Sequence, residues 1–146
     1  MTLKRLTLLL FLFAVLLMGG CKKYPDGPEF SLLPKSWRLA GDWKTTKILE
    51  NNIDVTAREL ATVNYESRKI DKNGSFSYEL VEGGSTLSYA GSWSFSSDKT
   101  IVYFTYAFAS TGSTDQFLIL RLKEKDLWLQ NISPTGDVME YHFSPN

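Results

Sequence analysis

Residues 65–80, YESRKIDKNGSFSYEL, carry the clearest structural signal in this sequence. Phe76, Tyr78 and Leu80 alternate with polar residues, and this two-residue period is typical of a strand with one buried face. The Asn73-Gly74 pair ahead of them suits the positive φ angles of a tight hairpin turn. The segment is therefore predicted to form two antiparallel strands joined by that turn.

The same alternation recurs along most of the chain. Further strands are predicted at residues 41–49, 92–96, 101–106, 117–122, 127–132 and 138–143, which gives about eight strands in all. Short strands joined mainly by tight turns remove their exposed edges most completely by closing on themselves. We therefore expect an all-β antiparallel meander closed into a barrel. A β-sandwich is the alternative, and residues 50–63 and 107–114 are the longest connections available to it.

Two connections have a more specific prediction. Residues 56–62 are expected to form one short helix after the first strand, with Thr56 as N-cap and Glu59 as its capping-box partner. This helix would flank or plug one end of the barrel. Residues 83–86, Gly-Gly-Ser-Thr, are expected to form a flexible loop.

The first twenty residues are predicted to be a cleaved signal peptide. Lys4 and Arg5 precede a thirteen-residue apolar run from Leu6 to Met18, and no acidic residue precedes Cys21. This run is shorter than the ~20 residues that a membrane-spanning helix needs. The small residues that follow it suit a signal peptidase.

The segment Met18-Gly19-Gly20-Cys21 resembles the lipobox of bacterial lipoproteins. That resemblance implies cleavage before Cys21, a diacylglycerol on its thiol and a further acyl chain on its amine. Two or three acyl chains would anchor the protein stably in a membrane. The alternative is an ordinary signal peptide followed by an accidental cysteine. Because Cys21 is the single cysteine, no disulfide forms within one chain.

Residues 21–36 are predicted to be the lipidated N-terminus and an extended tether. Pro25, Pro28 and Pro34 argue against regular secondary structure there. In polyproline geometry such a linker would hold the domain up to about 45 Å from the bilayer. Lys22 and Lys23 either contact anionic headgroups or are incidental charges.

The Gly41-Asp42-Trp43 segment resembles the Gly-x-Trp opening strand of lipocalin-like proteins. Together with the lipobox and the tether, it makes the chain resemble the lipocalin-like lipoproteins common in Bacteroidetes. The resemblance implies a calycin-type barrel over residues 37–146, in which Arg121 on a late strand stacks on Trp43 and closes the barrel. A guanidinium over an indole is worth ~0.5–2 kcal/mol. In the alternative interpretation, Arg121 reaches into a cavity and holds an anionic ligand.

Charge and motif content exclude several function classes. From Cys21 onward, 14 basic residues stand against 16 acidic ones, without the basic face that a nucleic-acid-binding protein needs. The sequence shows no metal-ligand spacing and no Gly-x-Ser-x-Gly motif, so neither a cofactor nor an enzymatic activity is expected. His142, the single histidine, is interpreted as a surface residue.

The aromatic content leaves two hypotheses for function. In the first, aromatic side chains line a cavity that receives a small apolar or amphiphilic molecule, and the protein is a non-catalytic binding module. In the second, the same side chains fill a solid barrel, and the protein acts through its outer surface on an envelope protein. The residues predicted to point inward are Phe76, Tyr78, Trp93, Phe95, Tyr103 and Tyr141.

The residue after Cys21 bears on localisation. In the sorting rule of bacterial lipoproteins, Asp at that position retains the protein at the inner membrane, and here the residue is Lys22. The lipobox resemblance therefore implies an outer-membrane lipoprotein. A periplasm-facing domain is expected, with exposure on the cell surface as the alternative.

Overall fold

The computed structural model describes residues 24–25, 32–107 and 112–146. The predicted signal peptide, Cys21 and most of the tether lie outside these ranges. None of the helices within them has the length and apolar content that crossing a bilayer requires. The elements, in chain order, are α2 (Lys35–Leu39), β1 (Gly41–Glu50), β2 (Ile53–Asp54), α3 (Thr56–Glu59), β3 (Val63–Ile70), β4 (Ser75–Glu82), β5 (Ser85–Phe95), β6 (Ile101–Tyr106), β7 (Thr114–Leu122), β8 (Leu127–Ile132) and β9 (Val138–Pro145).

The strands form a closed antiparallel barrel, as predicted. From β3 to β9 each strand pairs with the next along the chain, β1 pairs with β3, and β9 returns to pair with β1. The closing register runs from Trp43 opposite Pro145 to Glu50 opposite Met139. The short strand β2 adds a ninth strand beside the end of β1. Because the sheet closes on itself, the alternative of a sandwich is wrong.

The turn chemistry explains the register of the long β3–β4–β5 hairpins. In the predicted turn Gly74 has a φ of 91°, whereas Asn73, the other residue of the pair, does not have a positive φ. Gly83 and Gly84 also have positive φ values, and they form a tight turn after which β5 begins at Ser85. The prediction of a flexible loop at residues 83–86 is therefore wrong. Positive φ at two glycines makes the two-residue turn that a hairpin favours.

The apolar core gathers at one end of the barrel. We call this the closed end; it comprises α2 and the turns at residues 71–74, 96–100 and 123–126. We call the opposite end, with the connections at 51–62, 83–84 and 133–137, the open end. The core residues are Tyr24, Leu39, Trp43, Ile70, Phe76, Val102, Phe104, Phe117, Ile119, Leu122, Leu127, Leu129 and Phe143. Most of them lie on strand segments next to the closed end.

The predicted pairing of Trp43 with Arg121 is wrong. Trp43 is buried in the core, and its Nε1 donates to the Leu39 carbonyl at 2.9 Å. Arg121 lies on the outer face, 4.6 Å from the centre of the Trp128 ring, and pairs with Asp126 at 3.0 Å. The β7–β8 register shifts between Ile119 and Arg121, and Arg121 is then paired with outward-facing Trp128 while Ile119 stays buried. A bulge changes which side chains face inward.

Arg38 connects the N-terminal helix α2 to the late strand β7 through a buried hydrogen bond. This side chain is 7% exposed, and its Nη1 donates to the Leu122 carbonyl of β7 at 2.6 Å. Because α2 carries both Arg38 and Leu39, it covers the closed end and holds β1 and β7 together. The closure expected of Arg121 is therefore provided from a segment that precedes the first strand.

The predicted tether departs from an extended linker at two described points. Helix α2 begins at Lys35, inside the range assigned to the tether. Tyr24 is only 3% exposed and packs in the core, so part of the tether is docked on the barrel. Proline punctuation excludes a long helix but says nothing about whether a side chain between the prolines is buried.

The short helix after the first strand is confirmed, with a different cap. Helix α3 has Val55 as its N-cap and no side-chain capping bond. The Thr56 hydroxyl instead accepts a hydrogen bond from the Ile48 amide of β1 at 2.9 Å. The capping box of Thr56 and Glu59 is therefore wrong, because Thr56 is used to fasten α3 to the barrel wall.

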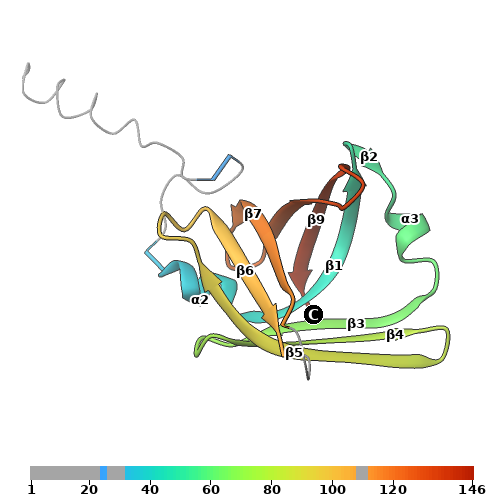
Figure 1. The fold of residues 1–146 in the computed structure, drawn as a ribbon, viewed down its shortest axis with the longest axis horizontal. Coiled ribbons are helices and arrows are strands. Elements are labelled where there is room, and N and C mark those ends of the chain that lie inside the picture. Colours follow the sequence, from blue (N-terminus) through green and yellow to red (C-terminus); the bar gives the residue numbers. More distant parts are fainter. Residues whose placement is uncertain (1–23, 26–31, 108–111) are drawn as a thin grey trace, which may run out of the picture.

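The barrel opens where β1 leaves β3. These strands pair only over Gly41–Trp43, whereas β1 follows β9 as far as Glu50. Figure 1 shows the β3–β4–β5 layer continuing along the bottom while β1 and β9 rise away from it, with α3 on the side between them. This divergence creates the space in which the candidate site lies.

Candidate functional site

Two adjoining hollows lie at the open end. The first has a volume of about 270 Å³ and is lined by Thr45, Ile48, Glu59, Leu60, Val63, Glu66, Arg68, Tyr78, Leu80, Glu82 and Tyr141. The second has a volume of about 280 Å³ and is lined by Tyr78, Tyr89, Tyr106, Ser113 and Asp115. Tyr78 belongs to both walls, so we treat the two hollows as one site, the mouth cavity.

A guanidinium and a carboxylate form the charged part of the mouth cavity. The Arg68 guanidinium lies between two aromatic rings, 4.9 Å from the centre of Tyr78 and 4.8 Å from that of Phe143. It faces Glu66 at 3.9 Å. The Thr45 hydroxyl donates to Glu66 at 2.8 Å, and the Thr45 amide donates to its other oxygen at 3.3 Å. The two charges compensate each other, which lowers the penalty of burying them.

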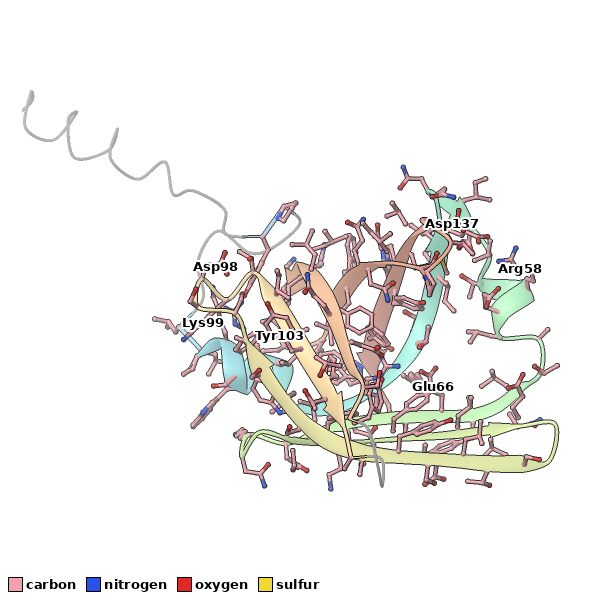
Figure 2. The ribbon with its side chains drawn as sticks, in the orientation of Figure 1. Arg58, Glu66, Asp98, Lys99, Tyr103 and Asp137 are labelled. Carbon is pink, nitrogen blue, oxygen red and sulfur yellow. The ribbon has the colours of Figure 1, made fainter. Side chains whose placement is uncertain are left out.

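The position of this pair follows from the strand period. Ile70 is buried in the core, so the residues two and four places before it on β3 face the same side of the sheet. In Figure 2, Glu66 lies above β3, toward β1 and β9. Because β1 diverges from β3 beyond Trp43, the inner face of β3 meets space there rather than a packed core. Arg68 thereby offers hydrogen-bond donors at the cavity wall.

Tyrosines form most of the aromatic lining. Tyr78 and Tyr89 lie side by side with centroids 6.1 Å apart, and Tyr106 meets Tyr89 edge to face at 6.1 Å. The Tyr106 hydroxyl donates to Asp115 at 2.9 Å. Burial raises the pKa of Tyr106 to about 12, and the neighbouring Asp115 carboxylate adds to the rise. Burial also raises the pKa of Tyr78 and of Tyr141. These side chains therefore offer neutral hydroxyls beside apolar rings.

Stability should fall steeply at alkaline pH because of the raised pKa of Tyr106. Its pKa is about 12 in the folded protein and about 10 when unfolded, so unfolding releases a proton between these values. The free energy of unfolding is then expected to decrease from about pH 10 to about pH 12. Urea unfolding followed by circular dichroism at several pH values measures this slope. Because burial also raises the pKa of Tyr24 to about 12, Tyr106→Phe should make this slope shallower without abolishing it. Tyr65→Phe, at an exposed tyrosine, should leave the slope unchanged; equal slopes in all three proteins would contradict the assignment.

The structure places three of the six residues predicted to point inward in or next to the mouth cavity. Tyr78 and Tyr141 line it. Phe76 is buried next to the cavity, on its closed-end side, and the centres of the Phe76 and Tyr106 rings are 5.2 Å apart. Their alternation on β4 and β9 therefore identified the correct face of each strand.

Trp93 and Phe95 pack against the core farther from the cavity. They stand at the end of β5 that leads into the closed end, and Trp93 Nε1 donates to the Asp71 carbonyl at 2.8 Å. Neither residue lines either of the two hollows. Both side chains point inward, as predicted. Because they lie near the closed end and pack against the core, they contribute to the structure and not to the cavity lining.

Tyr103 faces outward, so its predicted inward direction is wrong. Val102 and Phe104 on either side of it are both buried in the core. Its partners across the strands are Ser94 and Gln116, which are both exposed. The four residues from Ile101 to Phe104 are apolar or aromatic in succession, so alternation alone does not tell which face of this strand is inside.

Sequence reasoning missed Glu66, Arg68, Tyr89, Tyr106 and Asp115. The polar residues that surround Glu66 and Arg68 on this strand give no direct indication of a buried face. The available signal was Ile70, because once it is assigned to the core, the period of two brings Arg68 and Glu66 to the inside. Tyr106 follows in the same way from Phe104.

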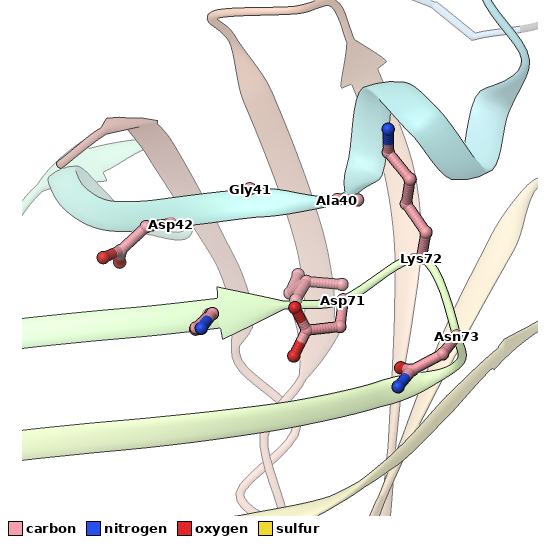
Figure 3. Close-up of a pocket in the computed structure, with 8 residues that line it drawn as sticks. Ala40, Gly41, Asp42, Asp71, Lys72 and Asn73 are labelled. Carbon is pink, nitrogen blue, oxygen red and sulfur yellow. The ribbon is translucent and has the colours of Figure 1, made fainter.

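A hollow of about 530 Å³ outside the barrel is a poorer candidate. It lies between the start of β1 and the β3–β4 turn, and its lining is Ala40, Gly41, Asp42, Lys69, Ile70, Asp71, Lys72 and Asn73. Figure 3 shows Asp42, Lys72 and Asn73 pointing in different directions, so their polar groups do not converge on one ligand position. Binding sites enclose the ligand and present a few convergent polar groups, whereas this hollow is open to solvent and its polar groups do not converge.

The placement of potential metal ligands and of the single histidine bears on the chemistry of the described ranges. No group of three or more His, Cys, Asp and Glu side chains there is placed to hold a metal ion. His142 lies on the outer wall, stacked on Trp128 at 4.0 Å, with its Nε2 2.6 Å from a Glu140 oxygen. His142 points to the outer surface, as predicted. Its neighbours cover most of its side chain, which is only 14% exposed.

Comparison with known proteins bears on the fold. No family model and no curated protein matches this sequence. Among solved structures, the chain is similar to insecticyanin from the tobacco hornworm Manduca sexta, with a TM-score of 0.57 and 14% identity over 85% of this chain and 68% of that one. Insecticyanin is a lipocalin. The barrel described above therefore has a lipocalin-like fold.

Proposed function

We propose that this protein is a lipid-anchored cell-envelope lipoprotein whose barrel binds a small apolar or amphiphilic molecule without catalysis. The observation that carries the proposal is the contrast between the two barrel ends. Core side chains fill the closed end, whereas the open end holds the mouth cavity with its tyrosines and the Arg68–Glu66 pair. A lipocalin-like fold commonly encloses one small ligand in such a position.

The lining favours an amphiphilic ligand. Ile48, Leu60 and Leu80 give the first hollow an apolar wall, while Arg68 and Glu66 give it hydrogen-bonding groups of both kinds. Because these two charges already face each other, a neutral polar group on the ligand loses less solvation than a fixed charge. Each hollow is near the lower limit of ~300 Å³ for ligand pockets, which supports a small ligand.

Binding can be tested in two steps. Native mass spectrometry of the mature protein, purified gently from its host envelope, should show a co-purifying small molecule. Titration with the neutral fluorescent amphiphile N-phenyl-1-naphthylamine should then show saturable binding that the extracted molecule displaces. A clean mass and no saturable binding would contradict the proposal and favour an interaction protein that acts through its outer surface.

Variants at the cavity should separate specific from surface binding. Tyr78→Ala removes a ring common to both hollows, and we expect the dissociation constant for the probe to rise about tenfold or more, a loss of at least ~1.4 kcal/mol. Tyr103→Ala removes the same group from the outer wall and should leave the constant unchanged. Equal effects of both variants would place the probe outside the mouth cavity.

The lipid anchor and the localisation are separate parts of the proposal. The lipobox-like segment before Cys21 supports acylation, and Lys22 in place of Asp supports sorting to the outer membrane. Growth with labelled palmitate should label the protein but not a Cys21→Ala variant. Protease treatment of intact cells should leave a periplasm-facing domain intact, whereas degradation would show exposure on the surface.

A further inference from the structure

Tyr24 fastens the segment that follows the predicted anchor to the closed end of the barrel. Its side chain is 3% exposed, and its hydroxyl donates to the Lys99 carbonyl at 2.8 Å. The Lys35 ammonium lies 4.8 Å from the centre of its ring. Tyr24 is therefore part of the barrel core, although it is far in sequence from the other core residues around it.

The position of Tyr24 limits the reach of the anchor. Only Lys22 and Lys23 lie between Cys21 and Tyr24. At 3.3–3.6 Å per extended residue, Cys21 is at most about 11 Å from the docked tyrosine. A chain acylated at Cys21 would thus be tied to its membrane at the closed end, rather than through a tether of about 45 Å.

The exposed side chains at the closed end suit a membrane interface. Trp37 on α2 is 54% exposed, and Leu32 just before it is 89% exposed. The Lys72 ammonium lies 3.9 Å from the centre of the Trp37 ring. Tryptophan and lysine side chains are typical of the headgroup region, where an amphipathic ring and a positive charge both find favourable surroundings.

The open end has the opposite character. It carries acidic side chains at Glu50, Asp54, Glu59, Glu82 and Asp137. Arg58 already pairs with Glu50 and Glu59, and Lys47 pairs with Asp54. At the closed end, by contrast, lysines and acidic residues alternate in the turns at 71–74, 96–100 and 123–126. An anionic bilayer surface repels an acidic face more strongly than a balanced one.

We propose that the closed end rests on the lipid surface and that the mouth cavity opens away from the membrane. Figure 2 shows the geometry, with Asp98 and Lys99 at one end of the molecule and Arg58 and Asp137 at the other. The inference rests on the proposed lipid anchor at Cys21. Its functional consequence is that ligand enters from the aqueous compartment or from a facing partner, and not from the bilayer below.

The orientation can be measured with fluorescent labels placed at the two ends of the same strand, β5. Ser85→Cys lies at the start of β5 at the open end, and Ser97→Cys lies in the turn after β5 at the closed end; both serines are exposed. The twelve residue steps from position 85 to position 97 span up to about 40 Å at 3.3 Å per residue. Because acylation consumes the thiol of Cys21, each variant of the full lipoprotein carries a single thiol for a fluorescent label.

The labelled lipoproteins are placed in vesicles of phosphatidylethanolamine and phosphatidylglycerol that contain a headgroup spin-labelled lipid. We expect quenching of the label in the Ser97→Cys protein to exceed quenching in the Ser85→Cys protein severalfold. Equal quenching, or stronger quenching at the open end, would overturn the orientation. Palmitate incorporation is measured in the same samples, and its absence would overturn the lipid anchor together with the orientation that rests on it.

The role of Tyr24 is tested by releasing it. Tyr24→Ala should bring the two quenching values together, whereas Tyr65→Ala, at an exposed tyrosine, should preserve their difference. Tyr24→Phe keeps the buried ring and loses only the bond to the Lys99 carbonyl, so it should keep most of the contrast. Urea midpoints of the variants establish that each barrel is folded. A contrast that survives Tyr24→Ala in a folded protein would overturn the role of this residue.

Discussion

Replacing Trp43 with alanine is expected to lower the free energy of unfolding by about 3–5 kcal/mol. Trp43 is 2% exposed, in the core at the closed end. The change leaves a large cavity in the core. The surrounding strands cannot move far enough to fill it, because each is hydrogen-bonded to its neighbours in the closed barrel. It also removes the indole donor that binds the Leu39 carbonyl at 2.9 Å, which leaves a buried acceptor without that partner. Urea unfolding measures the loss.

Trp37 provides the matched control for this substitution. It is the same residue type on the neighbouring helix α2, but it is 54% exposed. Trp37→Ala should therefore change the free energy of unfolding by less than about 1 kcal/mol. A loss under about 1 kcal/mol for Trp43→Ala as well would refute the role of Trp43 as a core residue at the closed end.

Gly91→Ala is expected to destabilise the protein by about 3 kcal/mol or more, or to prevent folding. A Cβ at this position would lie 2.0 Å from the Thr105 carbonyl oxygen and 2.8 Å from a ring carbon of Phe76. The oxygen belongs to the backbone of β6, so it moves only if β5 and β6 separate and lose hydrogen bonds between them. Expression in folded form and the urea midpoint measure the effect.

Gly84→Ala separates this clash from the ordinary effect of removing a glycine. Gly84 has a φ of 81° and nothing within 4 Å of an added Cβ. Its replacement should therefore show only the strain of a left-handed residue, about 1–2 kcal/mol. If Gly91→Ala destabilised no more than Gly84→Ala, the close approach of β5 and β6 at Gly91 would be contradicted.

The sequence by itself determined the all-β class and most of the strands and turns, and it favoured closure into a barrel over a sandwich. It missed the short strand β2 and the first part of β5, from Ser85 to Gly91. Phe76, Tyr78 and Leu80 share one face because side chains alternate along any strand, and the chain turns at residues 71–74 because Gly74 accepts a φ of 91°. These are local properties of the chain. The succession of such hairpins leaves two free edges, and their pairing is the simplest way to satisfy them.

The tertiary structure alone decided which residues form the site and what closes the barrel. A register shift in β7 turned Arg121 to the outer wall, where it meets Trp128, and Arg38 from a distant segment took over the contact with β7. The divergence of β1 from β3 placed Arg68 and Glu66 in a cavity instead of a core. Alternation assigns two faces to a strand, but bulges and contacts between distant segments decide which face is inside and where it stays open.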